Sequence, residues 1–134
     1  MADTVTSQKI VDGERNLVMK FTNISDGTGE SAVTKVDVST LSKDAYGAPC
    51  TRVTVSKIYI ATHGMEVRMY WDASTDVPFF LSAAGATQTL DFSGFTSIPN
   101  DAGAGVNGNI VFSTVDHTAG DSYWCILEMV KGYA

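Results

Sequence analysis

The chain has 134 residues, which suits one domain built around a single hydrophobic core. Apolar residues make up 44% and charged residues 18%, a balance that argues against intrinsic disorder. The formal net charge of −6 argues against a protein that grips nucleic acid through its phosphates, and no apolar run approaches the roughly 18 residues that span a membrane.

The residue usage is that of a β protein. The chain holds 14 Val, 7 Ile and 15 Thr, against 5 Leu, 4 Glu and 2 Gln. Side chains branched at Cβ suit a pleated, half-buried surface and lose freedom in a helix. The first seven residues contain neither a basic segment nor an apolar segment, so we expect no signal peptide and synthesis in the cytoplasm of a host cell.

The first third of the chain predicts an edge segment and two strands. Residues 1–13 are polar and end in Asp-Gly, which indicates an N-terminal arm or an edge strand, with Lys9-Ile10-Val11 as its apolar anchor. A strand is expected over 16–24. After the Ser-Asp-Gly-Thr-Gly turn at 25–29, alternating valines predict a second strand over 33–41.

The middle of the chain predicts a hairpin. Apolar residues alternate over 52–61 and again over 65–71, and Thr62-His63-Gly64 between them is typical of a turn. The segment 77–81 follows as an edge strand or a loop, because Pro78 has no N–H to donate to a neighbouring strand. A short strand is expected over 87–92.

The last third predicts a long loop and a second hairpin. Residues 93–109 carry four glycines, a proline and three asparagines, which favours an irregular contact loop. Residues 109–115 are expected to pair with 122–130. Both faces of the latter segment are largely apolar, so it is either central in its sheet or covered from outside.

Together these elements predict an all-β fold. We expect a single antiparallel β-sandwich or small barrel of about eight strands, jelly-roll-like, over residues 14–134, preceded by the segment 1–13.

Catalytic and metal-binding patterns are missing from the sequence. The two histidines, 63 and 117, fall in expected turns, and a zinc site needs three or four ligands. Cys50 and Cys125 do not form a Cys-x-x-Cys pair, so free thiols are expected, with a disulfide as the alternative. No nucleophile and base have a catalytic spacing. We therefore predict no enzyme, no cofactor and no metal.

Three stretches resemble small virion structural proteins of tailed bacteriophages, especially those that infect aquatic bacteria. They are MADTVTSQKIVDGERNLVMKFTNISDGTGESAVTKVDVSTL at 1–41, WDAST at 71–75 and HTAGDSYWCILEM at 117–129. The likeness runs over nearly the whole length. It implies a virion component and assigns no role to particular residues.

A compact, acidic β domain of this kind suits a capsid decoration, or cement, protein on the exterior of the head. Such a protein is expected to form homo-oligomers, typically trimers, and to bridge subunits of the major capsid protein. Many copies would each make modest contacts that add through avidity. Residues 2–13 would then order on a capsid edge by main-chain pairing, with Val5, Ile10 and Val11 as apolar contacts, and their deletion should leave a folded domain.

The segment 77–81 is the second predicted interface. Two adjacent phenylalanines after a proline should not both face one core, so either Phe79 or Phe80 contacts a neighbouring chain, or both pack under a local loop. Two other functions stay open. One is a neck or tail protein, either a head–tail connector or a tail-tube protein whose stacking the hairpin 52–71 could mediate. The other is a glycan-binding module in which Trp71, Trp124 and the five tyrosines form a platform.

Overall fold

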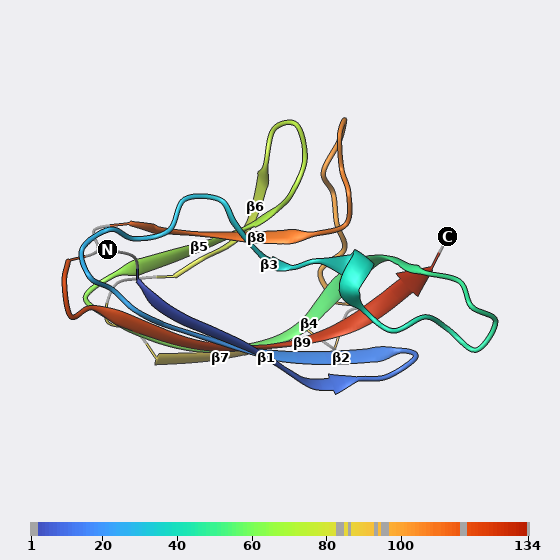
Figure 1. Ribbon diagram of the computed structural model, residues 1–134, viewed down its shortest axis with the longest axis horizontal. Helices are drawn as coiled ribbons and strands as arrows, with labels where there is room; N and C mark the ends of the chain where they lie inside the picture. The colour runs from blue at the N-terminus through green and yellow to red at the C-terminus, as the bar shows by residue number, and fades with distance from the viewer. Residues whose placement is uncertain are drawn as a thin grey trace.

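The computed structural model describes residues 3–82, 85, 87–92, 94, 97–115 and 118–133. Within them, nine strands form two antiparallel sheets that pack face to face as a β-sandwich (Figure 1). The elements are β1 Thr4–Asp12, β2 Asn16–Ile24, β3 Val33–Val36, the 3-10 helix η1 Val38–Thr40, β4 Cys50–His63, β5 Glu66–Trp71, β6 Val77–Leu81, β7 Thr87–Asp91, β8 Ile110–Val115 and β9 Ser122–Tyr133.

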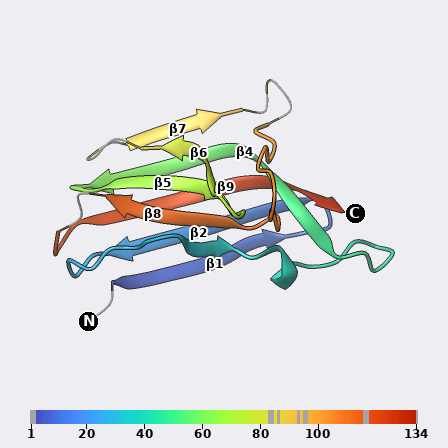
Figure 2. The ribbon, with the colours of Figure 1, turned by 90° about the horizontal axis from the view of Figure 1, so that it is seen from above.

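The strand order is that of a jelly roll. One sheet has the order β1-β2-β9-β4-β7 and the other β3-β8-β5-β6 (Figure 2). The pairs are nested along the chain: β2 pairs with β9, β3 with β8, β4 with β7 and β5 with β6. A long hairpin rolled up on itself produces this arrangement. The prediction of an all-β, jelly-roll-like sandwich is therefore confirmed.

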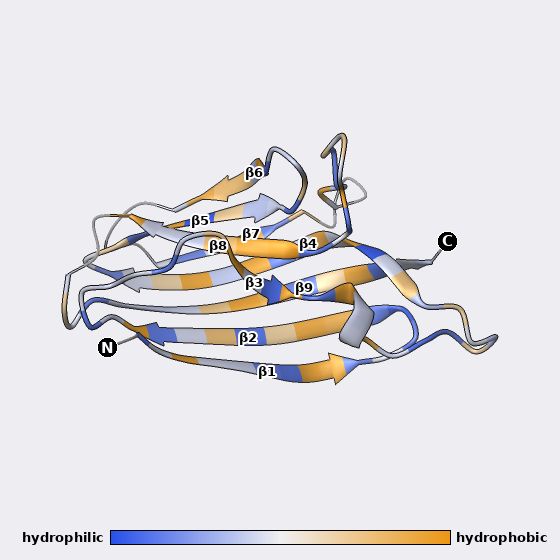
Figure 3. Ribbon diagram, turned by 45° about the horizontal axis from the view of Figure 1, so that its top comes forward, coloured by the Kyte–Doolittle hydropathy of each residue, from blue (hydrophilic) through white to orange (hydrophobic). Residues whose placement is uncertain are grey.

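The core lies between the two sheets and follows the period-two pattern of the strands. Along β2, the buried residues alternate with partly exposed ones. Phe21 of β2 and Phe112 of β8 meet edge to face across the interior, with ring centroids 5.2 Å apart. Trp71 is fully buried and opposes Ile110 of β8, a strand that Figure 3 shows as largely apolar.

Both predicted hairpins are wrong. β4 lies in the five-stranded sheet and β5 in the four-stranded one, so the turn at Thr62–Gly64 carries the chain from one sheet to the other. Likewise β8 and β9 lie in different sheets. A tight turn reverses the chain direction in either case. The residues of the turn do not determine whether the next strand pairs with the previous one in the same sheet or enters the opposite sheet.

Other expectations fare differently. The strand expected over 33–41 ends at Val36, because Asp37 starts a 3-10 turn by accepting a hydrogen bond from the Ser39 N–H. β9 is the central strand of its sheet, which was one of the two explanations for its apolar faces. β6 is an edge strand in the four-stranded sheet, which accommodates Pro78.

Candidate functional site

The segment 4–12 is β1, which lies at one edge of the five-stranded sheet. It pairs with β2 on one side only, and every residue from Thr4 to Val11 is exposed. The predicted contact residues Val5, Ile10 and Val11 are 46%, 47% and 44% exposed. A register shift between Lys9 and Val11 marks a β-bulge at Ile10. Such an edge presents unpaired main-chain groups to another strand.

Both ends of β1 are anchored in the domain. The Asp3 carboxylate accepts hydrogen bonds from the N–H groups of Asp26 and Gly29, both at 3.2 Å, and from the Asn23 amide at 3.1 Å. At the other end, Asp12 forms an ion pair with the buried Lys131. Deletion of residues 2–13 would therefore also unpair Lys131, so substitution is the cleaner test of this edge.

Phe79 and Phe80 both pack inward. Phe80 is 9% exposed and belongs to the core, and Phe79 stacks on Trp71 with ring centroids 4.3 Å apart. A register shift in the pairing of β5 with β6 opposes Tyr70 to Pro78 and Met69 to Phe80. This bulge lets two consecutive residues contact the interior, which strict alternation would forbid.

The two tryptophans have different environments. Trp71 is fully buried, so it cannot serve as a platform for a glycan. Trp124 is 42% exposed and lies on the outer face of the five-stranded sheet, opposite Thr22 on one side and Ala61 on the other. Trp71 therefore cannot belong to the predicted sugar-binding platform, whereas Trp124 is accessible.

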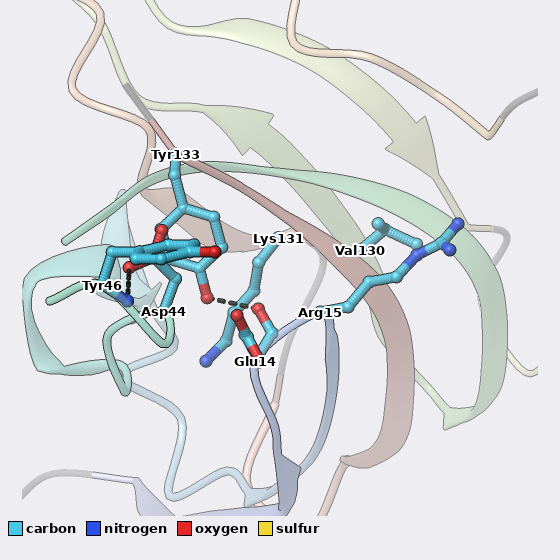
Figure 4. A pocket seen from close by; sticks show the side chains of 7 residues that line it. All are labelled: Glu14, Arg15, Asp44, Tyr46, Val130, Lys131 and Tyr133. Atoms are coloured by element: carbon cyan, nitrogen blue, oxygen red, sulfur yellow. Dashed lines mark hydrogen bonds between the residues drawn. The ribbon is translucent and has the colours of Figure 1, made fainter. Parts of the chain in front are cut away.

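A groove is present that the sequence did not suggest. One pocket of about 390 Å³ is bordered by Tyr46, Tyr133, Glu14 and Arg15. Figure 4 shows Tyr46, Tyr133, Asp44 and Glu14 gathered on one side of it and Arg15 with Val130 on the other. A second pocket of about 550 Å³ shares Arg15 and Val130 with the first.

Tyr46 is held on a closed turn although its side chain is 95% exposed. The Asp44 carboxylate accepts hydrogen bonds from the N–H groups of Tyr46 at 2.9 Å and Ala48 at 2.8 Å. The Ala45 N–H donates to the Glu14 carboxylate at 3.0 Å. The loop therefore presents an aromatic ring from a fixed backbone. Asp44 and Gly47 are the sequence signal for this turn.

Lys131 beside this pocket is a structural cation. Its ammonium donates to the Asp12 carboxylate and, at 3.2 and 2.8 Å, to the carbonyl and hydroxyl oxygens of Ser42. These three bonds engage all three N–H donors of a lysine. The proximity of Ser42 and Lys131 is thus explained by the ion pair and does not indicate a serine nucleophile with a lysine base.

A second buried ion pair closes the opposite end of the sandwich. Lys35 lies 2.5 Å from Glu30, and both side chains are nearly inaccessible. Glu30 also accepts hydrogen bonds from Tyr123 at 2.7 Å and Asn23 at 2.9 Å. Burial, followed by the charge of Glu30 and its hydrogen bond, raises the pKa of Tyr123 far above its ordinary range. The cluster joins β2, β3 and β9. The charges of Lys35 and Glu30 are satisfied within it, so it is a structural cluster.

Neither cysteine is poised for chemistry. Both are buried and unpaired, and burial raises the pKa of each thiol. Cys50 is opposite Tyr133, eight residues along β9 from Cys125, a separation of roughly 26 Å that rules out a disulfide within the folded chain.

The described residues contain no group of three or more His, Cys, Asp and Glu side chains placed to hold a metal. His63 is exposed at the end of β4, and His117 lies outside the described residues. In that same part of the chain no helix has the length and apolar character to cross a membrane.

No family model and no curated protein matches the chain. Among solved structures, a cupin superfamily protein from Desulfitobacterium hafniense DCB-2 aligns over 98% of this chain and 80% of its own, with 8% identity and a TM-score of 0.35.

Proposed function

We propose that this chain is a bacteriophage virion structural protein that decorates the capsid. In this role it lies on the outer head lattice, binds the major capsid protein and stabilises the shell by bridging neighbouring subunits. It acts as a homo-oligomer, with a trimer as the expected form, and not as an enzyme. The sequence resemblance supports a virion role, and jelly rolls recur in capsid proteins.

The observation that carries this proposal is the free edge of β1. Nine residues of strand are paired on one side only, are anchored at both ends and carry three exposed apolar side chains. An anchored edge loses little conformational freedom when a further strand is added, so the main-chain pairing is not offset by ordering.

The alternative of a tail protein loses its structural support. That hypothesis used the segment 52–71 as a protruding hairpin for stacking, but β4 and β5 lie in different sheets and do not pair. A head–tail connector does not need that hairpin, and the number of copies per particle distinguishes it from a decoration protein.

Cryo-electron microscopy of the particle that carries this chain tests the proposal. Density at hundreds of lattice positions on the outer shell is the expected result. Density confined to one vertex or to the tail, or its absence from the particle, would refute the decoration role.

Paired substitutions test the edge itself. Ile10→Lys places a charge on the β1 edge, and Val106→Lys places the same charge on a distant loop at the same exposure of 47%. We expect Ile10→Lys to lower capsid occupancy at least about tenfold while the melting temperature stays within a few degrees, because surface changes cost little stability. Equal occupancy for the two variants would contradict a role for β1.

A further inference from the structure

Two adjacent pockets share Arg15 and Val130 and together make a groove: one lies on the outer face of β9 and β4, and the other lies at the end of the sheet, where Tyr133 packs against the core and Lys131 is buried. We propose that this groove binds a linear, uncharged oligosaccharide. This binding function goes beyond the decoration role and does not depend on it. The groove begins at Tyr46 and Tyr133, passes Arg15 at the turn between β1 and β2, and continues across β9 and β4.

The aromatic end supplies stacking surfaces. Tyr46 presents its ring almost wholly to solvent from a turn fixed by Asp44 and Glu14. The Tyr133 hydroxyl donates to the Glu14 carbonyl, which fixes the orientation of a second ring in the same pocket (Figure 4). The Tyr133 ring also packs against the core, whereas Tyr46 is held through its backbone and its ring is free to adapt to a ligand; both present aromatic surface to the apolar faces of sugar rings.

The far end supplies hydrogen-bonding groups. Its floor is β4, where a register shift between Val55 and Lys57 leaves Ser56 as the extra residue of a bulge, and Thr54 lies beside it. On one side is Glu128, which accepts a hydrogen bond from Tyr59 at 2.6 Å. The Ser56 hydroxyl donates to the Glu128 carbonyl at 2.9 Å and can still accept a hydrogen bond. Together with Thr54, the Glu128 carboxylate and the Lys57 ammonium, it can bond the hydroxyls of a sugar chain.

Ser97 forms the other side and has a strained backbone. Its φ of +73° lies in the left-handed region, which is costly for a residue with a Cβ, and it is 8% exposed. The neighbouring Ile98 holds the segment against β4 through two hydrogen bonds with Val55, of 2.9 and 3.1 Å. Backbone strain retained at the wall of a groove is a feature of binding sites.

The charges favour an uncharged ligand. Three carboxylates border the groove, those of Glu14, Asp44 and Glu128, together with three cationic side chains, those of Arg15, Lys57 and Lys131. Lys131 is already neutralised by Asp12. A polyanion such as nucleic acid or an acidic polysaccharide would meet as much repulsion as attraction.

The position in the sheet argues against a peptide. β9 has hydrogen-bonded neighbours on both sides, and on the far side of β4 the main chain of Val55 and Ser56 is bonded to that of Ile98 and Phe92, so the floor offers no long open strand edge for main-chain pairing. Apart from Tyr46, Tyr133 and Val130 the side chains that line the groove are polar or charged, so it offers few apolar pockets for the alternate side chains of an extended peptide.

The test is affinity electrophoresis of the full-length protein, followed by titration calorimetry with defined sugars. The neutral probes are the hexasaccharides of cellulose, β-1,3-glucan, β-mannan and chitin, and the charged probes are an alginate hexasaccharide and heparin. We expect one or more neutral hexamers to bind with a dissociation constant below 1 mM and to shift the backbone NMR signals of residues 44–46 and 54–57.

Variants locate the site. Tyr46→Ala should weaken binding at least tenfold, and Tyr46→Phe should retain it, because stacking needs the ring and not the hydroxyl. Trp124→Ala removes an exposed aromatic ring of the five-stranded sheet that lies outside the groove, and should leave binding unchanged. Since Tyr46 is almost fully exposed, its loss should not affect folding.

Three results would overturn the proposal. They are no binding of any neutral hexamer at 5 mM, binding of the charged probes alone, and equal effects of Tyr46→Ala and Trp124→Ala. Because capsid occupancy is measured separately, failure here leaves the decoration role standing, and loss of that role leaves this site standing.

Discussion

The ion pair between Asp12 and Lys131 yields an asymmetric prediction for stability. The Lys131 side chain is fully inaccessible, whereas that of Asp12 is 22% exposed. Asp12→Asn leaves a buried ammonium without a counter-charge, and removal of one partner of a buried pair costs about 3–5 kcal/mol. Because the new amide oxygen and the two Ser42 oxygens still accept hydrogen bonds from the ammonium, we expect about 2–3 kcal/mol.

The reverse substitution should cost less. Lys131→Met replaces the cation by an apolar chain of similar length, and the remaining Asp12 carboxylate reaches water and still accepts hydrogen bonds from Ser42. We expect about 1 kcal/mol. Urea unfolding followed by tryptophan fluorescence measures both. With a slope of about 1.5 kcal/mol per M, Asp12→Asn lowers the midpoint by about 1.5 M and Lys131→Met by about 0.7 M.

The pH dependence gives an internal control. Partial burial alone would raise the pKa of Asp12, but hydrogen bonds from Lys131 and Ser42 bring it below its ordinary value. The stability from this group is therefore present above about pH 4 and lost as the pH falls through the lowered pKa. The gap between wild type and Asp12→Asn should shrink below pH 4. Equal costs for the two substitutions, or a gap that does not narrow as the pH falls below 4, would refute this reasoning.

Three further predictions concern the fold. Gly108→Ala should cost about 3 kcal/mol or more, because its Cβ would lie 2.0 Å from the Thr51 carbonyl oxygen, whereas Gly47→Ala, with the same left-handed φ but open space, should cost about 1 kcal/mol by thermal unfolding. Both thiols should resist Ellman's reagent at pH 8 until the protein unfolds, and rapid labelling of the native protein would contradict their burial. Trp124→Phe should remove the fluorescence that acrylamide quenches and leave a blue-shifted emission, and an unchanged quenching profile would be inconsistent with the 42% exposure of Trp124.

The sequence predicts individual strands better than their partners. β2 and β6 match their expected ranges, because alternation and turn residues act locally. Partner choice depends on the nested topology, in which strands that follow each other along the chain fall in opposite sheets. A turn such as Thr62–Gly64 serves either outcome, so the two expected hairpins had no local evidence against them.

For the candidate sites as well, the sequence predicts features that depend on one segment and misses those that depend on contacts between segments. Exposure of Val5, Ile10 and Val11 follows from a polar, edge-like segment, which composition reveals. The inward packing of Phe79 depends on a bulge opposite β5, and the groove joins residues from the turn after β1, the loop before β4, and β9. No pattern within a single segment carries that information.

The nesting of strand pairs has a consequence for how the chain folds. β5 and β6 are joined by a short turn, and once they pair, β4 and β7 are brought close without the cost of closing the whole intervening loop. The same holds in turn for β3 with β8 and β2 with β9. We therefore expect β5 and β6 to pair first and the outer strand pairs to form after them in order. Because β9 lies between β2 and β4, the five-stranded sheet joins into one surface only in the final step, and its outer groove with it.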